Sequence, residues 1–130
     1  MENLLLILMI ISIVFNAIGN GMRQRNANGI IYHIFWGLEI LIFLSFIFIP
    51  LQPTILNILI VITSYSLLRF GLFNSIRNIA AKQHIMYIGG TAWQDIKLTT
   101  IFNTPTLRGV LFTVRWLLFI IGIVLMQNIL

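Results

Sequence analysis

Charged residues are scarce in this chain: only 8% of its 130 residues are Asp, Glu, Lys or Arg, whereas 59% are hydrophobic. Soluble domains carry roughly a quarter charged residues, because polar side chains must cover their surface. The scarcity therefore excludes an ordinary soluble domain. Cysteine is absent altogether, which excludes disulfides, thiolate metal sites and cysteine nucleophiles.

Acidic residues are the rarest charged group, with three against eight basic residues and a net charge of +5. In a soluble protein such an excess suggests a nucleic-acid partner. No basic and aromatic binding patch accompanies the charge here, so we predict no nucleic-acid partner. In a membrane protein, basic residues that flank the spans are instead held on the cytoplasmic side.

Long apolar runs occupy most of the chain, and four of them are long enough to cross a hydrocarbon core of about 30 Å. They cover about residues 3–19, 30–49, 54–70 and 110–126. The first differs from a signal peptide, because Glu2 precedes it where a basic region is expected. Pro50 and Pro53 predict a tight turn after the second run. We expect one all-α transmembrane domain over residues 1–130, an integral membrane four-helix bundle.

A more polar segment, residues 71–107, separates the third and fourth runs. Apolar residues recur at helical spacing over 71–82, which is typical of an amphipathic helix at a membrane surface. A second short surface helix is expected at about 92–101. Thr104 and Pro105 then have the form of a helix start, with a hydroxyl cap before a proline. The pattern predicts one or two amphipathic surface helices between the third and fourth spans, in a cytoplasmic interfacial segment.

The positions of the basic residues predict the orientation. These residues are Arg23, Arg25, Arg69, Arg77, Lys82, Lys97, Arg108 and Arg115. With four spans, all of them fall on or near one side, which holds the loop at 20–29 and the segment 71–107. The positive-inside rule makes that side cytoplasmic. We therefore expect a multi-pass protein of the cytoplasmic (inner) membrane with both termini outside.

Glu39 is the only acidic residue inside a predicted span. A carboxyl group there costs a few kcal/mol unless it is paired, protonated or hydrated. Arg69 is its expected partner, because the two differ by about 7 Å in depth, which an arginine side chain can reach across. His33 and Arg115 are expected as neighbours. The pair fits either a proton-linked or ion-pathway site, or a buried contact that fixes the packing of the second and third spans.

Cofactor and metal sites are not expected. His33 and His84 have no second histidine or carboxylate four positions away, as a metal site on a helix requires. No catalytic constellation is recognised either. Asp95 reads as a surface residue beside Lys97, although it could combine with His84 in a site that faces lipid headgroups.

Membrane lipids are the expected partners. Four basic side chains and one tryptophan are candidates for contact with anionic headgroups on the cytoplasmic side. These residues are Arg77, Lys82, Lys97, Arg108 and Trp93. Asn16 and Asn20 belong to a set of amides that can join helices by hydrogen bonds, within the chain or between copies. We expect a homo-oligomer or a subunit of a membrane complex.

One stretch of the chain resembles a known group. The run Arg69-Phe70, Phe73-Asn74 and Asn78, followed by Tyr87-Ile88-Gly89-Gly90-Thr91 and Asp95, is similar to small uncharacterised polytopic membrane proteins of bacteria and their phages. The resemblance covers about a third of the chain. It implies a compact multi-span protein with a cytoplasmic surface helix. Some of those proteins carry Asp where this chain has Asn16, Asn20 and Asn74.

Three classes of function stay open. We favour a structural, accessory or permeability-altering assembly of the holin-like kind, because it needs only the topology and packing already inferred. The alternative is an oligomeric ion channel or small-solute transporter that uses Glu39 and Arg69. A lipid-modifying membrane enzyme is a second alternative, although no nucleophile triad, phosphate loop or metal cluster is present.

Overall fold

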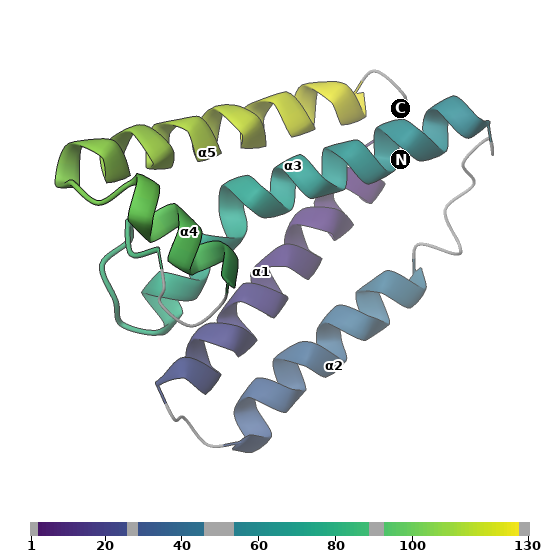
Figure 1. Ribbon diagram of the computed structural model, residues 1–130. Helices are drawn as coiled ribbons and strands as arrows, with labels where there is room; N and C mark the ends of the chain where they lie inside the picture. Colours follow the sequence, from purple (N-terminus) through teal and green to yellow (C-terminus); the bar gives the residue numbers. More distant parts are fainter. Residues whose placement is uncertain (1–2, 26–28, 46–53, 89–92, 128–130) are drawn as a thin grey trace.

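Helices are the only regular elements in the part of the chain that the structure describes. The computed structural model describes residues 3–25, 29–45, 54–88 and 93–127. Five helices lie in these ranges (Figure 1): α1 (Leu4–Gln24), α2 (Gly29–Ser45), α3 (Ile55–Ala80), α4 (Trp93–Ile101) and α5 (Pro105–Gln127). The predicted all-α class is confirmed for these residues.

Three helices, α1, α3 and α5, are long and apolar enough to cross a membrane. They contain 21, 26 and 23 residues. Large aliphatic side chains cover their outer surfaces; in α3, for example, Ile55 and Leu56 are 79% and 65% exposed. A surface of this composition is poorly suited to water and well suited to lipid.

The predicted span at 30–49 corresponds to α2, whose described part has 17 residues. At 1.5 Å per residue it is about 26 Å long, slightly less than the hydrocarbon core. Its apolar stretch, His33–Ile42, is shorter than the three candidate spans. Residues 46–49 of the predicted span and the predicted turn at 50–53 lie outside the described residues.

The expected separate surface helix at 71–82 is not found, because α3 runs without a break from Ile55 to Ala80. Gly71 lies inside this helix, and the buried face continues beyond it through Leu72, Ser75 and Asn78. Leu68 before the glycine and Leu72 after it belong to the same buried cluster, so the packed face of the helix continues across Gly71. The first of the two expected surface helices is therefore the last part of α3.

The first loop also starts later than predicted, because α1 extends to Gln24 instead of ending near residue 19. Gly21 is buried against the last turn of α3, where an added Cβ would lie 2.6 Å from Cβ of Ala80. This contact between the ends of α1 and α3 stabilises the extra turn of helix.

Two later boundaries agree with the sequence. The short helix expected at about 92–101 is α4, Trp93–Ile101, and α5 begins at Pro105. The side-chain oxygen of Thr104 accepts a hydrogen bond from the backbone N–H of Leu107 at 3.2 Å. Thr104 therefore caps α5 as predicted.

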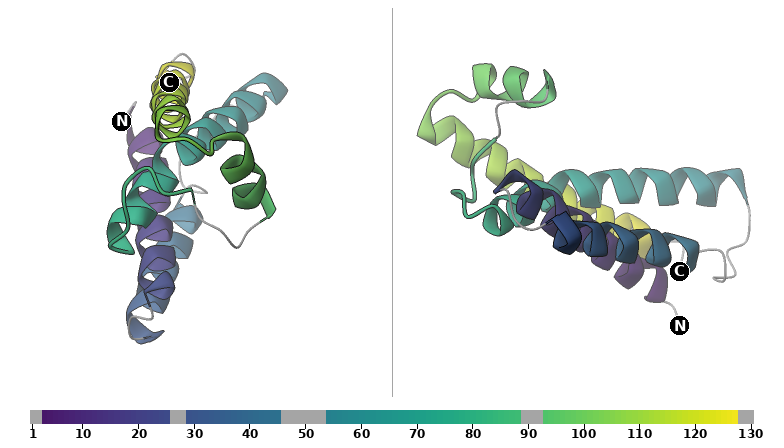
Figure 2. Two further views of the ribbon diagram at one scale, coloured as in Figure 1. Left: turned by 60° about the vertical axis from the view of Figure 1, so that its left-hand side comes forward. Right: turned by 90° about the horizontal axis from the view of Figure 1, so that it is seen from below.

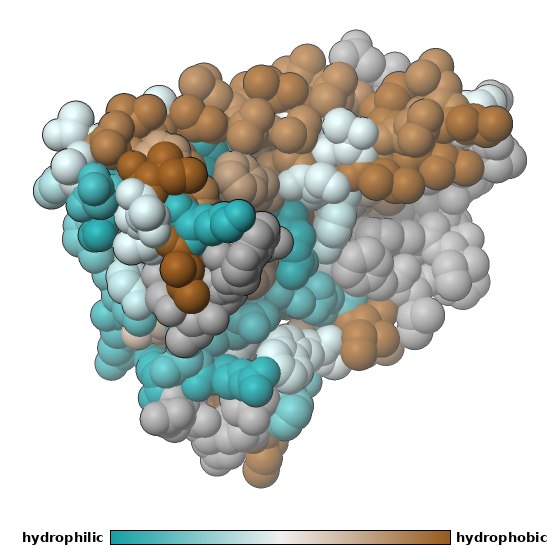
Figure 3. Space-filling view, in the orientation of Figure 1, coloured by the Kyte–Doolittle hydropathy of each residue, from teal (hydrophilic) through white to brown (hydrophobic). Residues whose placement is uncertain are grey.

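Four of the five described helices lie in a row, in the order α5, α3, α1 and α2 (Figures 1 and 2). Extensive contacts join neighbours in this row among the described residues, so the arrangement is more open than the expected four-helix bundle. The start of α1 and the end of α5 lie near one another, at the same end of the long helices (Figure 1), and Leu5 and Met126 belong to one buried cluster. The opposite end holds the last turns of α1 and α3 and the start of α5, and Figure 3 shows that hydrophilic residues gather there.

The core lies where α1, α3 and α5 meet, near the start of α1 and the end of α5. Leu5, Met9 and Ile13 of α1 pack with Leu68 of α3 and Met126 of α5, and each is at most 2% exposed. In a bilayer the surrounding lipid is as apolar as these side chains, so close packing stabilises such a contact more than removal from water does.

Aromatic side chains attach α2 to α1. The indole of Trp36 lies on Gly19, where an added Cβ would be 2.9 Å from the ring, and the guanidinium of Arg23 lies 5.7 Å from the ring centre. The rings of Phe15 and Phe35 are 5.8 Å apart. Tryptophan and arginine commonly sit together at membrane–water interfaces, where the ring and the cation attract each other.

Glycines bring α3 and α5 close together at two points. A Cβ added at Gly71 would lie 2.5 Å from the backbone oxygen of Arg115 and 2.6 Å from Cβ of Phe119. A Cβ added at Gly122 would lie 3.1 Å from the backbone oxygen of Ser64. Small residues at helix contacts are the usual means of close approach in membranes.

The contact at Gly71 gives a direct test of this packing. We expect Gly71→Ala to destabilise the protein by about 1–3 kcal/mol, because the methyl group meets backbone and α5 must move away. The measurement is SDS-induced unfolding in mixed micelles, followed by circular dichroism. Gly109→Ala is the matched control, because nothing lies within 4 Å of its added Cβ. Equal effects of the two substitutions would contradict the close α3–α5 contact.

Candidate functional site

Polar side chains from three helices meet inside the otherwise apolar row. We call this group the Asn16 cluster: Asn16 and Asn20 of α1, Glu39 of α2, and Tyr65 and Arg69 of α3. Each side chain projects from an apolar helix at the contact with its neighbour. The cluster is the candidate site, because ionisable groups at such depth are functional candidates by default.

Asn16 bridges the two charged members of the cluster. Its Nδ2 donates a hydrogen bond to Oε2 of Glu39, and its Oδ1 accepts one from Nη2 of Arg69 at 3.3 Å. Nη1 of Arg69 lies 4.0 Å from Oε1 of Glu39. A side-chain amide carries both a donor and an acceptor, so it can contact a carboxylate and a guanidinium at once. One amide thus links α1, α2 and α3.

Further contacts hold Asn16 and Arg69 in this orientation. Asn20 donates from Nδ2 to the backbone oxygen of Asn16 at 2.8 Å and to its Oδ1 at 3.0 Å. Arg69 donates from Nη1 to the hydroxyl of Tyr65 at 3.4 Å, and its guanidinium lies 4.8 Å from the ring centre of Phe73. With two donors on Oδ1, the acceptor capacity of the Asn16 amide is filled.

Glu39 is the more buried of the two charged residues. Its side chain is 13% exposed, against 40% for Arg69. Placing a carboxylate at the centre of a membrane helix costs about 2.5–3.5 kcal/mol on insertion scales. Both oxygens of Glu39 face donors in the cluster, and these contacts offset part of that cost.

The other two predicted members lie elsewhere. His33 is exposed on α2, and its ring meets that of Trp36 edge-on at 5.5 Å. Arg115 is 2% exposed, and its guanidinium lies 5.5 Å from the ring centre of Phe70. Arg115 therefore belongs to the α3–α5 contact, on the far side of α3 from Glu39.

The bridging role of Asn16 is not evident from the sequence, in which Asn16 is one of several amides that can join helices. A usable signal was present, because Asn16 and Asn20 are four residues apart and so share one face of an apolar helix. The two amides therefore form a polar stripe on this helix, and a charged residue of a neighbouring helix can pack against it.

The residues predicted to contact headgroups are spread over the end of the molecule that holds the last turn of α3, α4 and the start of α5. Lys82 and Lys97 are exposed, whereas Arg77 and Arg108 are partly buried and each donates a hydrogen bond to a backbone oxygen. The side chain of Trp93 lies outside the described residues. Among the residues that the structure describes, no group of three or more His, Cys, Asp or Glu side chains is arranged to hold a metal ion.

The fold and the cluster define an all-helical protein with three helices that could cross a membrane and a polar network among its helices. Comparison with known proteins finds no matching family model, curated protein or solved structure. The functional argument therefore depends on the geometry of this chain alone.

The bridging role of Asn16 predicts unequal effects for the two asparagines. We expect Asn16→Ala to destabilise the protein by about 2 kcal/mol, because it removes a hydrogen bond to a charged group and leaves Glu39 with fewer donors. Asn20→Ala should cost less than about 1 kcal/mol, because the hydrogen bonds that Asn20 donates to Asn16 stay within α1. Unfolding in mixed micelles measures both. The bridge is refuted if the two variants lose the same stability.

Proposed function

We propose that this chain is a small multi-span protein of the cytoplasmic membrane that acts as a structural, accessory or permeability-altering, holin-like assembly. The observation that supports this proposal is the Asn16 cluster. In it, the carboxylate of Glu39 contacts Asn16 and Arg69, which belong to two other helices. An arrangement of this kind holds helices in register.

Four spans with both termini outside are part of this proposal. The fourth span would be α2, in whose described part His33 and Glu39 are the ionisable side chains among mainly apolar residues. The start of α1 and the end of α5 lie at the same end of the long helices (Figure 1), which supports an even number of crossings. The basic residues near the opposite end support a cytoplasmic location for that end, by the positive-inside rule.

Assembly with further copies or partners is supported by the exposed side of the cluster. The Arg69 side chain is 40% exposed although it lies well inside α3. A guanidinium that faces acyl chains is costly unless it reaches the interface, so contact with another chain or with water is favourable there. The amides and small residues of the helices suit such contacts between copies.

The same exposure favours a second candidate, an oligomeric ion channel or small-solute transporter. In an oligomer, Arg69 and Glu39 would lie beside a pathway formed between copies. Four helices leave little room for a pathway inside one copy, so this function requires an assembly.

Flux through liposomes distinguishes the two candidates. Purified protein and Glu39→Gln are reconstituted at equal, verified insertion, and ion flux and dye leakage are measured together. We expect Glu39→Gln to destabilise the protein by about 1–2 kcal/mol in mixed micelles, because a hydrogen bond to a charged group becomes a neutral one. We expect dye leakage per inserted protein to stay unselective and within about twofold of wild type.

Asp95→Asn is the matched control, because it removes the same charge from α4, outside the candidate spans. Selective ion flux that Glu39→Gln abolishes, with stability and insertion unchanged, would support the channel or transporter and overturn the structural role. If neither protein conducts but Glu39→Gln is less stable, the accessory-subunit form of the proposal is supported.

A further inference from the structure

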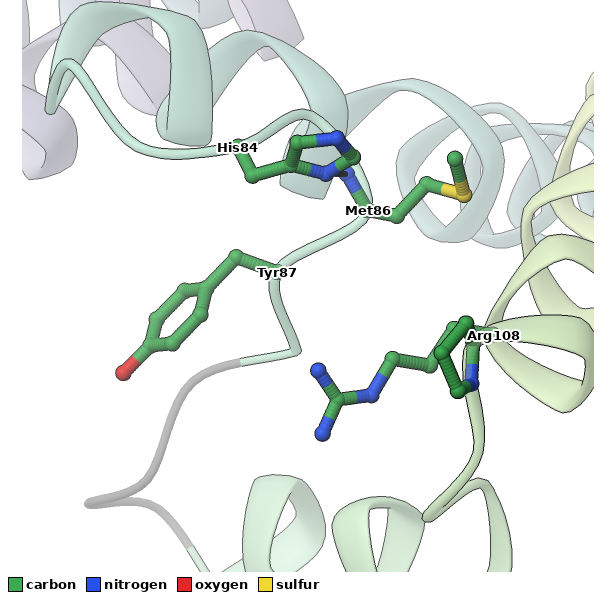
Figure 4. Close-up of a pocket in the computed structure, with 5 residues that line it drawn as sticks. His84, Met86, Tyr87 and Arg108 are labelled. Carbon is green, nitrogen blue, oxygen red and sulfur yellow. Dashed lines mark hydrogen bonds between the residues drawn. The ribbon is translucent and has the colours of Figure 1, made fainter.

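A pocket of about 180 Å³ lies between the segment after α3 and the start of α5 (Figure 4). It is lined by His84, Met86 and Tyr87 on one side and by Pro105 and Arg108 on the other. These residues come from separate parts of the chain that fold together. The Asn16 cluster does not include any of them.

The wall of the pocket that carries His84 and Tyr87 is held firmly to α3. Backbone N–H groups of Lys82 and Gln83 donate to the oxygens of Ile79 and Asn78, at 3.0 and 2.8 Å. With Lys82 in the left-handed region at φ 57°, these two bonds form a Schellman motif that ends α3. The chain is thereby turned back toward the helix that it leaves.

Asn78 then fixes the segment that follows. Its side chain is fully buried, and its Nδ2 donates to the backbone oxygens of Ile85 and Tyr87, at 3.0 and 2.6 Å. Arg77 donates to the backbone oxygen of Ile88 at 3.5 Å. A wall supported in this way is already formed before any ligand binds, which lowers the entropic cost of binding.

Arg108 provides the cation of the pocket. Its Nε donates to the backbone oxygen of Phe102 at 3.3 Å, which sets the direction of the guanidinium. Figure 4 shows the guanidinium extending from α5 toward the side of Tyr87, so that its terminal nitrogens border the open space. A planar guanidinium offers paired donors that match two oxygens of one phosphate group.

The surroundings of Arg108 favour an anion that is attached to an apolar group. The segment 71–108 contains four basic residues and one acidic residue, Asp95. Met86, Pro105 and the Tyr87 ring supply apolar surface beside the guanidinium. Arg108 also lies in the first turn of α5, a candidate span, at the depth where headgroups meet a membrane helix.

We propose that this pocket binds the phosphate group of an anionic phospholipid, with Arg108 as the anchoring residue. The inference rests on the membrane location in the proposed function, and it assigns a lipid site that the Asn16 cluster does not involve. The phosphate lies against the guanidinium, and the glycerol and the start of the acyl chains lie against Met86 and Pro105.

Native mass spectrometry of the full chain in detergent micelles tests this site. The probes are phosphatidylglycerol, phosphatidylcholine and inorganic phosphate, each titrated separately. We expect wild type to bind phosphatidylglycerol more tightly than phosphatidylcholine. Arg108→Gln should weaken the binding of phosphatidylglycerol about tenfold, and Arg108→Lys should weaken it less, since a point charge remains without the paired donors.

Lys97→Gln is the matched control, because it removes the same charge from an exposed site on α4 that does not line the pocket. It should change the affinity less than about twofold, because an exposed, screened charge adds little to a specific contact. Equal losses for Arg108→Gln and Lys97→Gln would overturn the site in favour of general surface attraction. Inorganic phosphate that binds as tightly as phosphatidylglycerol would overturn the lipid as the ligand.

Met86→Glu keeps the test decisive if Arg108→Gln fails to fold. It introduces a carboxylate into the pocket while Arg108 and its bond to Phe102 stay in place, and it should abolish preferential binding of phosphatidylglycerol. Unchanged binding by a folded Met86→Glu protein would refute the pocket. Lipid binding is measured in detergent, without a membrane. A failure to bind lipid is therefore distinguishable from a failure of the proposed function in the flux experiment.

Discussion

A carboxylate inside an apolar helix needs donors from its neighbours, and this requirement shapes the middle of the row. Glu39 obtains them from Asn16 and Arg69, so three helices must meet at one point with a defined rotation. The amide of Asn16 has to present its nitrogen to α2 and its oxygen to α3. An aspartate at this position could accept from Arg69 but could not donate to Glu39, and it would set two carboxylates against one arginine.

Hydropathy and charge alone predict much of this fold. Length and composition locate α1, α3 and α5, and Thr104 with Pro105 marks the start of α5. Depth counted from the predicted turn suggests Arg69 as the partner of Glu39, and the structure places the two 4.0 Å apart. Such inferences succeed because they depend only on the composition of a helix and on the depth of a residue along its axis.

The end of α3 could not be predicted in the same way. Arg77 and Asn78 look like the polar face of a helix at a membrane surface, and the sequence pattern does not reveal what covers that face. In the structure they bind backbone oxygens of residues 85–88, so the polar face is covered by the chain itself. The bridge at Asn16 was missed for a related reason, because an amide can serve many partners and its choice depends on how helices rotate against each other.

The length of α3 has a consequence for the membrane around it. A helix of 26 residues is about 39 Å long, whereas the hydrocarbon core of a typical bilayer measures about 30 Å. If α3 crosses the membrane upright, its first 20 residues fill the core, and its last turns, with Arg77 and Asn78, stand outside. In a thicker bilayer the same turns would be drawn toward the acyl chains, and tilting in a thinner one would relieve the mismatch. The depth of the segment that follows α3 would then vary with bilayer thickness. This end of the protein would therefore be sensitive to lipid chain length.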